Sequence, residues 1–351
     1  MAATMDIPAS AMPPRMPMQP GARNLITDVS GIAVGQAEDA RTRTGVTVIL
    51  PDERAVAAVD VRGGGPGTRE TDALAADTLV EAADAIVLSG GSVYGLAAAD
   101  GVTVWLGARG RGFGLAPGAP SAPIVPAAIL YDLANGGDKG WGEAPPYRDL
   151  GTQAVAAAGR DFVLGTAGAG AGAMAGRLKG GTGSASVAAD AWTVGALAAV
   201  NSFGSVVAPG GRAFWAAPFE IGEEFGGVPL AGARAAPDDW GLAKREPGVR
   251  TSTTLAVVAT DAALTPAEAR RVAVMAQDGM ARAIRPVHAP FDGDAVFVLS
   301  TGRRALPEPR PFALTVLGAA AADCLARAIA RGVYEATPWP DSGVTAWRDL
   351  A

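Results

Sequence analysis

The sequence predicts a layered α/β protein in which helices cover the faces of β-sheets. Several short segments are apolar on both faces, as strands buried on both sides are, and segments with helical spacing alternate with them. With 49% hydrophobic and 18% charged residues, the chain of 351 residues also has enough apolar material for a large core. We therefore expect a single domain over residues 25–351.

The chain begins with residues 1–24, which contain proline at intervals and no apolar run of signal-peptide length. This composition predicts a disordered arm. Two β-rich runs follow at residues 45–50 and 55–62, and the four residues between them predict a hairpin. The other elements expected in the first half are a helix over 69–83, a strand over 85–89, a helix over 92–108 and a strand over 123–131.

In the second half, residues 219–250 are rich in glycine, proline and charge, which predicts a long surface loop rather than a domain linker. A helix is expected to begin at Thr265, because Pro266 and Glu268 complete the pattern of an N-cap, a first-turn proline and an N3 acid. The other expected elements are strands over 182–188, 192–200, 204–208, 253–260 and 295–300 and a last helix over 313–334.

Rare residues exclude several classes of site. The single cysteine, Cys324, excludes an internal disulfide and a cysteine-rich metal centre, and the single histidine, His288, excludes a histidine-cluster metal site. The formal charge of −6 argues against a nucleic-acid surface, and no uncharged apolar stretch reaches membrane-spanning length. We expect no metal, no other cofactor, no nucleic-acid or membrane partner, and a cytoplasmic location.

A first candidate site lies at residues 90–95. Ser92 stands where a nucleophile elbow places its serine, but the second glycine of the G-x-S-x-G motif is missing, and His288 does not follow the acids in the order of that fold. Alternatively, the glycines permit close helix–sheet packing, and amides at the helix start hold an anion or a carbonyl. Gly91, Ser92 and Tyr94 are then candidate substrate-binding residues.

A second glycine-rich segment, residues 168–176, is similar to a dinucleotide-binding loop. The helix that such a loop needs is interrupted by Gly180 and Gly181, and Asp190 ends no clear second strand. Tight backbone packing is the better interpretation, and the chain has no P-loop motif.

Hydroxyl side chains cluster at residues 250–254, where the long loop meets a strand. Hydroxyls are common at strand starts, so a structural role is one interpretation. The other is chemical, because a hydroxyl nucleophile without an imidazole can be activated by the α-amine of its own residue after the backbone in front of it is cut. With a pKa near 8, about one-tenth of such an amine is unprotonated at pH 7.

Two acids, Asp292 and Asp294, precede the strand over 295–300. Carboxylates at positions i and i+2 of an extended segment point to the same side, so both can face one pocket. Asp-Gly is also ordinary turn chemistry, and the two interpretations stay open. His288 is expected to have a local partner rather than a catalytic role.

Three motifs support a family assignment: residues 62–72 (RGGGPGTRETD), residues 88–96 (LSGGSVYGL) and residues 124–132 (IVPAAILYD). Together with matching positions that continue to residue 294, they resemble the L-aminopeptidase/D-Ala-esterase family. That family includes β-aminopeptidases and the 6-aminohexanoate-oligomer (nylon-oligomer) hydrolases. The similarity covers about residues 25–335.

The resemblance implies a four-layer αββα sandwich that cuts itself between Ser252 and Thr253. The fragments, residues 1–252 and 253–351, would stay associated and assemble further, with a homotetramer of cleaved units expected. Thr253 would then be an N-terminal nucleophile. Relatives often carry Asn or Gly where this chain has Ser252, which is a departure from the family pattern.

The resemblance also implies roles for other residues. Asn201 matches the donor to the oxyanion, and Tyr131 and Lys179 match residues that orient the nucleophile and the substrate. Asp292 and Asp294 match acids that hold the Thr253 amine. Threonine with Asp-Gly-Asp is more similar to the nylon-oligomer hydrolases than to the branch with a serine nucleophile.

The predicted function is hydrolysis of linear amides through an acyl-enzyme, with 6-aminohexanoate oligomers or small peptides with a free N-terminus as substrates. A β- or D-aminopeptidase or esterase of the same family is the first alternative. The others are an esterase that uses Ser92 and His288, and an uncleaved binding protein without catalysis.

Overall fold

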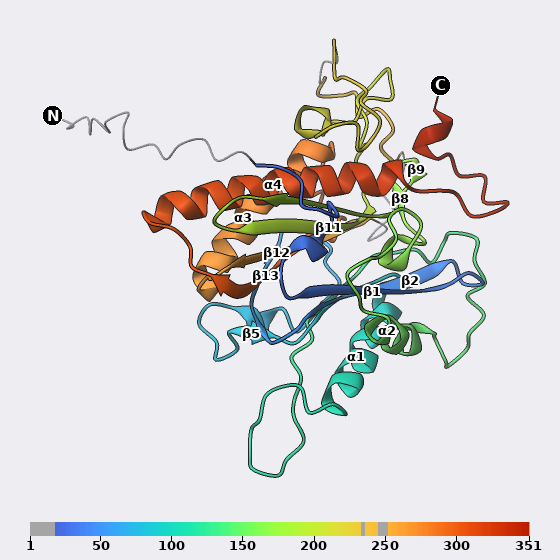
Figure 1. Cartoon of the computed structure of the whole chain (residues 1–351). Coiled ribbons are helices and arrows are strands. Elements are labelled where there is room, and N and C mark those ends of the chain that lie inside the picture. Colours follow the sequence, from blue (N-terminus) through green and yellow to red (C-terminus); the bar gives the residue numbers. More distant parts are fainter. Residues whose placement is uncertain (1–17, 233–235, 245–251, 351) are drawn as a thin grey trace.

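The computed structural model describes residues 18–232, 236–244 and 252–350, and it has a mixed α/β fold with two large sheets (Figure 1). The five-stranded sheet has the order β1 (Ile32–Asp39), β2 (Thr44–Pro51), β6 (Ile86–Ser89), β7 (Ala127–Ile129) and β4 (Thr68–Arg69). The six-stranded sheet has the order β10 (Thr182–Ala188), β11 (Thr193–Asn201), β12 (Thr253–Ala262), β13 (Ala295–Arg304), β3 (Ala55–Val61) and β5 (Ala82–Ala83). A small pair, β8 (Met174–Ala175) and β9 (Leu178–Lys179), stands apart from both.

Helices cover the outer side of each sheet. Figure 1 shows α3 (Pro266–Ala283) and α4 (Arg310–Tyr334) above the six-stranded sheet, and α1 (Ala98–Gly107) and α2 (Tyr147–Ala156) below the five-stranded sheet. The capping box predicted for α3 is present, since Thr265 Oγ1 accepts from Glu268 N at 3.3 Å and Glu268 Oε2 accepts from Thr265 N at 2.8 Å. The layered arrangement predicted from the sequence is thus confirmed at the level of a mixed α/β fold.

The strand β12 explains why the central segments are apolar on both faces. All of its residues are buried. Successive side chains of a strand point to opposite faces, so Leu255 and Val257 pack in the core between the two sheets, and Ala256 and Val258 pack under α3 and α4. Because both faces of β12 are covered, apolar and polar residues do not alternate along its sequence.

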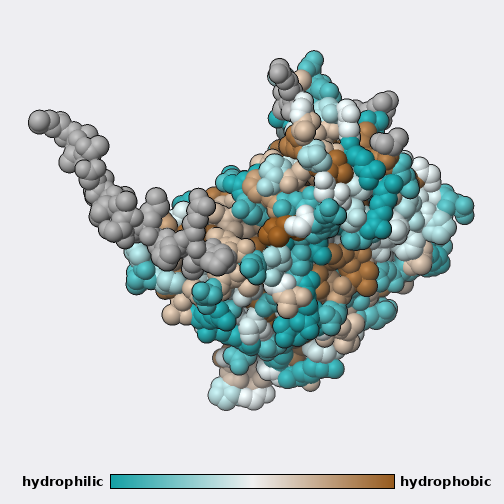
Figure 2. All heavy atoms as spheres, turned by 45° about the horizontal axis from the view of Figure 1, so that its top comes forward, coloured by the Kyte–Doolittle hydropathy of each residue, from teal (hydrophilic) through white to brown (hydrophobic). Residues whose placement is uncertain are grey.

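The helix α4 is long and apolar enough, by length and composition alone, to cross a membrane. Its buried residues pack on β10, β11 and α3, which accounts for this composition. Figure 2, in which the top of Figure 1 comes forward, shows hydrophilic residues interspersed with smaller hydrophobic patches over this face of the molecule.

Two predictions for the first half were wrong. The runs 45–50 and 55–62 are strands, but they form no hairpin, because β2 pairs with β1 and β6 whereas β3 pairs with β13 and β5 in the other sheet. The helix predicted over 69–83 is also absent. That segment contains the last residue of β4, the whole of β5 and one 3-10 turn. Leu79, an apolar residue within it, is 94% exposed.

Of the other predicted elements, several are present with changed bounds, and one predicted strand is absent. The helix over 92–108 is present as a 3-10 turn (Ser92–Ala97) followed by α1, and the strand over 123–131 is reduced to β7. Residues 204–208 form no strand and only isolated bridges, from Ser205 to Arg285 and from Val207 to Phe214. The elements β1 and α2 were not predicted from the sequence.

Part of the predicted N-terminal arm lies against the domain. Residues 1–17 are outside the described residues, but Gln19 forms a bridge with Ala188 at the end of β10, through N–O distances of 3.3 and 2.8 Å. Arg23 Nε donates to Asp161 at 2.9 Å. Residues 18–24 are therefore part of the folded unit.

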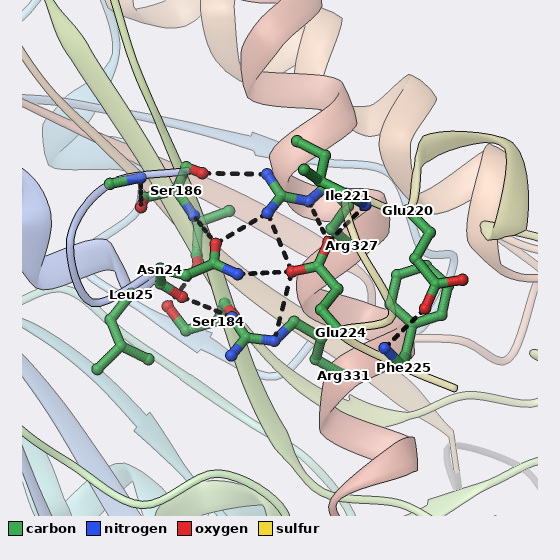
Figure 3. A network of polar contacts seen from close by, with 12 residues as sticks. Asn24, Leu25, Ser184, Ser186, Glu220, Ile221, Glu224, Phe225, Arg327 and Arg331 are labelled. Atoms are coloured by element: carbon green, nitrogen blue, oxygen red, sulfur yellow. Dashed lines mark hydrogen bonds and ion pairs between the residues drawn. The ribbon is translucent and has the colours of Figure 1, made fainter. Parts of the chain in front are cut away.

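A buried polar network holds the start of the domain, the loop after residue 219 and α4 together (Figure 3). Arg327 donates to both oxygens of Glu224, at 2.6 and 3.0 Å, and to Asn24 Oδ1 at 2.8 Å. Asn24 Nδ2 donates to Glu224 Oε2 at 2.6 Å. The side chains of Arg327 and Glu224 are only 1% and 8% exposed, so each charge depends on its partner.

Replacing Glu224 with glutamine should strongly destabilise the protein. The variant leaves the buried guanidiniums of Arg327 and Arg331 without their carboxylate, and breaking a buried pair from one side costs about 3–5 kcal/mol. Urea unfolding measures the loss. Glu335→Gln is the matched control, because the Arg348–Glu335 pair is exposed and such pairs contribute about 1 kcal/mol or less. Equal losses in the two variants would contradict a stabilising role for the buried network.

Candidate active site

The pairing of three strands brings the predicted site residues to one edge of the six-stranded sheet. Asn201 is the last residue of β11 and Thr253 the first of β12, and the antiparallel register places them opposite each other. The strand β13 runs parallel to β12, so the segment before it, which carries Asp292 and Asp294, arrives at the same edge. Residues between 39 (Thr253 to Asp292) and 93 (Asn201 to Asp294) positions apart in the sequence thus become neighbours.

The Ser252–Thr253 peptide lies at the centre of this edge. Thr253 is 4% exposed, and its Oγ1 donates to the carbonyl oxygen of Ser252 at 2.5 Å. The same oxygen accepts from Gly293 N at 3.0 Å. A Cβ atom at Gly293 would lie 2.6 Å from Thr253 Oγ1, so the close approach of the two segments requires glycine there.

The two acids have different partners. Asp294 accepts from Thr254 N at 2.7 Å with one oxygen, and from His288 N at 3.1 Å and His288 Nδ1 at 2.9 Å with the other. The local partner expected for His288 is therefore Asp294. Asp292 accepts from Ala289 N at 3.0 Å, and burial, followed by the nearby charge of Asp294, raises the pKa of the Asp292 carboxyl to about 6.

Asn201 and Lys179 are both fixed by backbone groups. Asn201 accepts from Met174 N at 2.9 Å and donates to the carbonyl oxygen of Tyr131 at 3.1 Å, which sets the orientation of its amide. Lys179 Nζ donates to three backbone carbonyls, those of residues 170, 173 and 180, at 3.3, 3.1 and 2.6 Å. Burial lowers the pKa of Lys179 to about 7, against the opposing charge of Asp132, so the amine is partly neutral at neutral pH.

A cavity of about 500 Å³ opens beside these residues, and Tyr131, Lys179 and Asn201 line it. Thr253 is buried beside the cavity and does not line it in the uncut chain. The volume lies within the range of sites for small molecules. The cavity also has lining residues that sequence reasoning missed: Arg43, Asp132, Lys244, Trp339 and Asp341.

Lys244 and Asp132 are the missed residues in closest contact with the predicted site. Lys244 Nζ donates to Ser252 Oγ at 3.1 Å, and Asp132 accepts from Thr44 Oγ1 at 2.6 Å and from Gly91 N at 2.7 Å. Asp132 stood in a recognised motif and could have been suspected. Lys244 lies among several charged residues of the long loop, and no spacing singles it out.

The predicted substrate-binding residues Gly91, Ser92 and Tyr94 do not line this cavity. Gly91 reaches it only through its bond to Asp132. Ser92 N donates to the Leu130 carbonyl, and Tyr94, 47% exposed, packs edge-on against Trp141.

Two alternative sites receive no support from the geometry. His288 Nδ1 is engaged by Asp294, and among the described residues no hydrogen bond joins Ser92 to His288. The glycine-rich segment after residue 168 begins with a 3-10 turn (Gly168–Gly170) and continues into β8, so the helix of a dinucleotide-binding loop does not follow it. Gly170 packs on the backbone of Thr182, as the interpretation of tight packing expected.

Two solved structures that share the fold are named as aminopeptidases. The chain is similar to a Burkholderia sp. β-aminopeptidase, with a TM-score of 0.64, 26% identity and coverage of 90% of this chain and 87% of that one. It also shares its fold with the L-aminopeptidase D-Ala-esterase/amidase of Ochrobactrum anthropi, described as a variant of the Ntn hydrolase fold, with a TM-score of 0.66, 22% identity and coverage of 94% and 93%. The fold is thus that of named aminopeptidases, enzymes that hydrolyse amide bonds.

The chain belongs to peptidase family S58, whose model matches residues 24–345. It is 46% identical over 345 residues to an uncharacterized aminopeptidase of Mycobacterium tuberculosis, covering 93% of this chain and 98% of the relative. It is 29% identical over 308 residues to the 6-aminohexanoate-oligomer endohydrolase of Kocuria sp., covering 82% and 78%. The family resemblance found in the sequence motifs is confirmed.

Replacing Gly293 with alanine should lower amide hydrolysis by about 100-fold. The added Cβ would displace the hydroxyl of Thr253, the candidate nucleophile, and a shift of about 1 Å at a reacting group has an effect of this size. Initial rates on a linear amide measure the loss. Gly114→Ala is the control, because a Cβ there meets nothing within 4 Å. Full activity of Gly293→Ala would show that the close contact is irrelevant to the chemistry.

Proposed function

We propose that the chain cuts itself between Ser252 and Thr253 and then uses Thr253 as an N-terminal nucleophile to hydrolyse linear amides. The observation that carries this proposal is the geometry of the Ser252 carbonyl. Its oxygen lies 2.5 Å from Thr253 Oγ1 and 3.0 Å from Gly293 N, so a hydroxyl and a backbone donor converge on one peptide group. The two sheets with their outer helices correspond in this proposal to the four-layer αββα sandwich of self-cleaving relatives.

Self-cleavage would proceed through an ester. Thr253 Oγ1 attacks the carbonyl carbon of Ser252, and the negative charge that develops on the carbonyl oxygen is stabilised by the N–H of Gly293. Transfer of the acyl group from nitrogen to oxygen, with the hydroxyl proton of Thr253 passing to the departing nitrogen, breaks the peptide bond and forms an ester. Water then hydrolyses the ester, leaving a carboxylate on Ser252 and a free amine and hydroxyl on Thr253.

The amide substrate would react by the same chemistry. Thr253 Oγ1 attacks the substrate carbonyl, the Thr253 amine takes the hydroxyl proton and delivers it to the leaving amine, and water hydrolyses the acyl-enzyme. Asn201 lies opposite Thr253 in the sheet, and its amide nitrogen would donate to the oxyanion. Asp292 and Asp294 supply negative charge beside the amine when it carries the proton.

Linear amides with a free amino end are the proposed substrates. Relatives at 46% and 29% identity are named as an uncharacterized aminopeptidase and a 6-aminohexanoate-oligomer endohydrolase, and both names describe hydrolysis of amide bonds. The cavity beside Asn201 has a volume suited to small peptides or short oligomers. A β- or D-aminopeptidase uses the same chemistry and differs only in the cavity walls.

Replacing Thr253 with alanine should abolish both self-cleavage and amide hydrolysis, because the attacking hydroxyl is lost. The wild type should give fragments of about 25 and 10 kDa, in proportion to 252 and 99 of the 351 residues and a mass of 35.1 kDa, with the smaller one beginning Thr-Thr-Leu-Ala. Intact mass and N-terminal sequencing test this. Thr253→Ser keeps a hydroxyl and should still be cut. A Thr253→Ala protein that hydrolyses amides at the wild-type rate would refute the mechanism.

Activity should fall below about pH 6, where Asp292 takes up a proton. Its pKa is raised to about 6, so the carboxylate is charged above this pH and neutral below it, and only the charged form stabilises the protonated Thr253 amine. Asp292→Asn should be slower at pH 8, and its rate should fall less steeply than the wild-type rate between pH 7 and 5, because only the Thr253 amine then titrates. Rates per cleaved chain on one linear amide, measured from pH 5 to 9, check this. An unchanged acid limb in Asp292→Asn would assign the titration to another group.

A further inference from the structure

Lys244 has no role in the chemistry described so far, although it contacts the residue before the cut. Its Nζ donates to Ser252 Oγ at 3.1 Å and to the Asn201 carbonyl oxygen at 3.4 Å. Its own backbone N donates to the Phe203 carbonyl at 2.9 Å, so the start of the side chain is fixed beside the end of β11. The ammonium therefore connects two segments that border the Ser252–Thr253 peptide.

The carboxylate of Asp292 provides the negative charge that interacts with the Lys244 ammonium. The carboxylate of Asp292 and the ammonium of Lys244 act on each other electrostatically, and Asp292 also forms a parallel bridge with Ser252. Ser252 is thus held on one side through its side chain by Lys244 and on the other through its backbone by the segment of Asp292 and Gly293. Both contacts restrict rotation of the residue that carries the carbonyl to be attacked.

We propose that Lys244 is a positioning residue for self-cleavage: its ammonium binds the Ser252 hydroxyl and thereby keeps the Ser252 carbonyl between Thr253 Oγ1 and the N–H of Gly293. This inference rests on the proposed self-cleavage. It concerns the step that forms the enzyme, in which the Thr253 amine is still part of a peptide bond and cannot act as a base. Precise placement of the hydroxyl and the carbonyl is then the main contribution that the chain can make.

The contact also gives Ser252 a function. A serine at this position presents a short hydroxyl that accepts a hydrogen bond from an ammonium. A side chain without such an acceptor would remove this hydrogen bond. Lys244 would still donate to the Asn201 carbonyl and interact with the charge of Asp292. The pair Lys244–Ser252 should accordingly behave as one unit when either member is changed.

The protonation state of Lys244 provides a readout that a purely structural role would not change. Burial lowers the pKa of Lys244 to about 8 against the opposing charge of Asp292, so the ammonium loses its proton above about pH 8. The other charged or titratable groups that line the same cavity are Arg43, Tyr131, Asp132, Lys179 and Asp341. Of these, Lys179 also has a pKa lowered by burial, to about 7.

The test follows the cleavage of freshly synthesised full-length chain by gel electrophoresis and intact mass at pH 6 to 10. Lys244→Met should slow cleavage by about 10- to 100-fold, and Lys244→Arg should restore most of the rate, because a guanidinium also donates to the Ser252 hydroxyl. The wild-type rate should decline above about pH 8, and the Lys244→Arg rate should not. Arg177→Met is the matched control, since Arg177 is an exposed cation that donates to the nearby Gly241 carbonyl and should leave the rate unchanged.

A double-mutant cycle separates the contact from general effects on folding. If the contact carries the effect, Lys244→Met should slow cleavage much less in a Ser252→Ala chain than in the wild type. Cleavage of Lys244→Met at the wild-type rate, or an equal slowing in both backgrounds, would overturn the proposal while leaving self-cleavage intact. A wild-type chain that stays uncut would overturn the proposed function and this inference together. Circular dichroism of each variant identifies one that fails to fold, and Lys244→Arg and Ser252→Ala, which preserve size, then provide the comparison.

Discussion

The site depends on the position of β12 between β11 and β13. Antiparallel pairing with β11 sets Thr253 opposite Asn201, and parallel pairing with β13 brings the Asp292–Asp294 segment to the same end. A one-residue shift of strand register turns every side chain to the opposite face, and the two buried faces of β12 pack in different parts of the core, so this packing selects the register. The hydrophobic core that specifies the sheet therefore also specifies the placement of the candidate site residues.

Burial at this edge also determines the electrostatics. Asp292, Lys179 and Lys244 are removed from water, and their pKa values move toward neutrality, to about 6, 7 and 8. Such groups cost stability, since a charge is better solvated by water than by the interior. In exchange they change protonation near neutral pH. Lys244 and the segment of Asp292 contact Ser252, and Lys179 lines the adjacent cavity. Perturbed groups of this kind are typical of functional sites.

The sequence singled out polar residues that lie together in the structure, and it predicted their surroundings less well. Asn201, Thr253, Asp292 and Asp294 were identified by family motifs, and the structure brings them together at one sheet edge. The strand β12 and the capped helix α3 were also predicted, because their signals are local. The hairpin between residues 45 and 62 was wrong, since local turn chemistry cannot show that β2 and β3 belong to different sheets.

The sequence by itself thus determined the family, the type of the strongly patterned elements and the identity of the central polar residues, because these depend on residue type and short-range spacing. Only the tertiary structure decided which strands pair, that the carbonyl of Ser252 meets both Thr253 Oγ1 and Gly293 N, and that Lys244 contacts Ser252. These contacts join segments whose approach is set by packing of the whole core. The shifted pKa values were also decided only by the tertiary structure, because desolvation is a property of the folded environment and not of any residue alone.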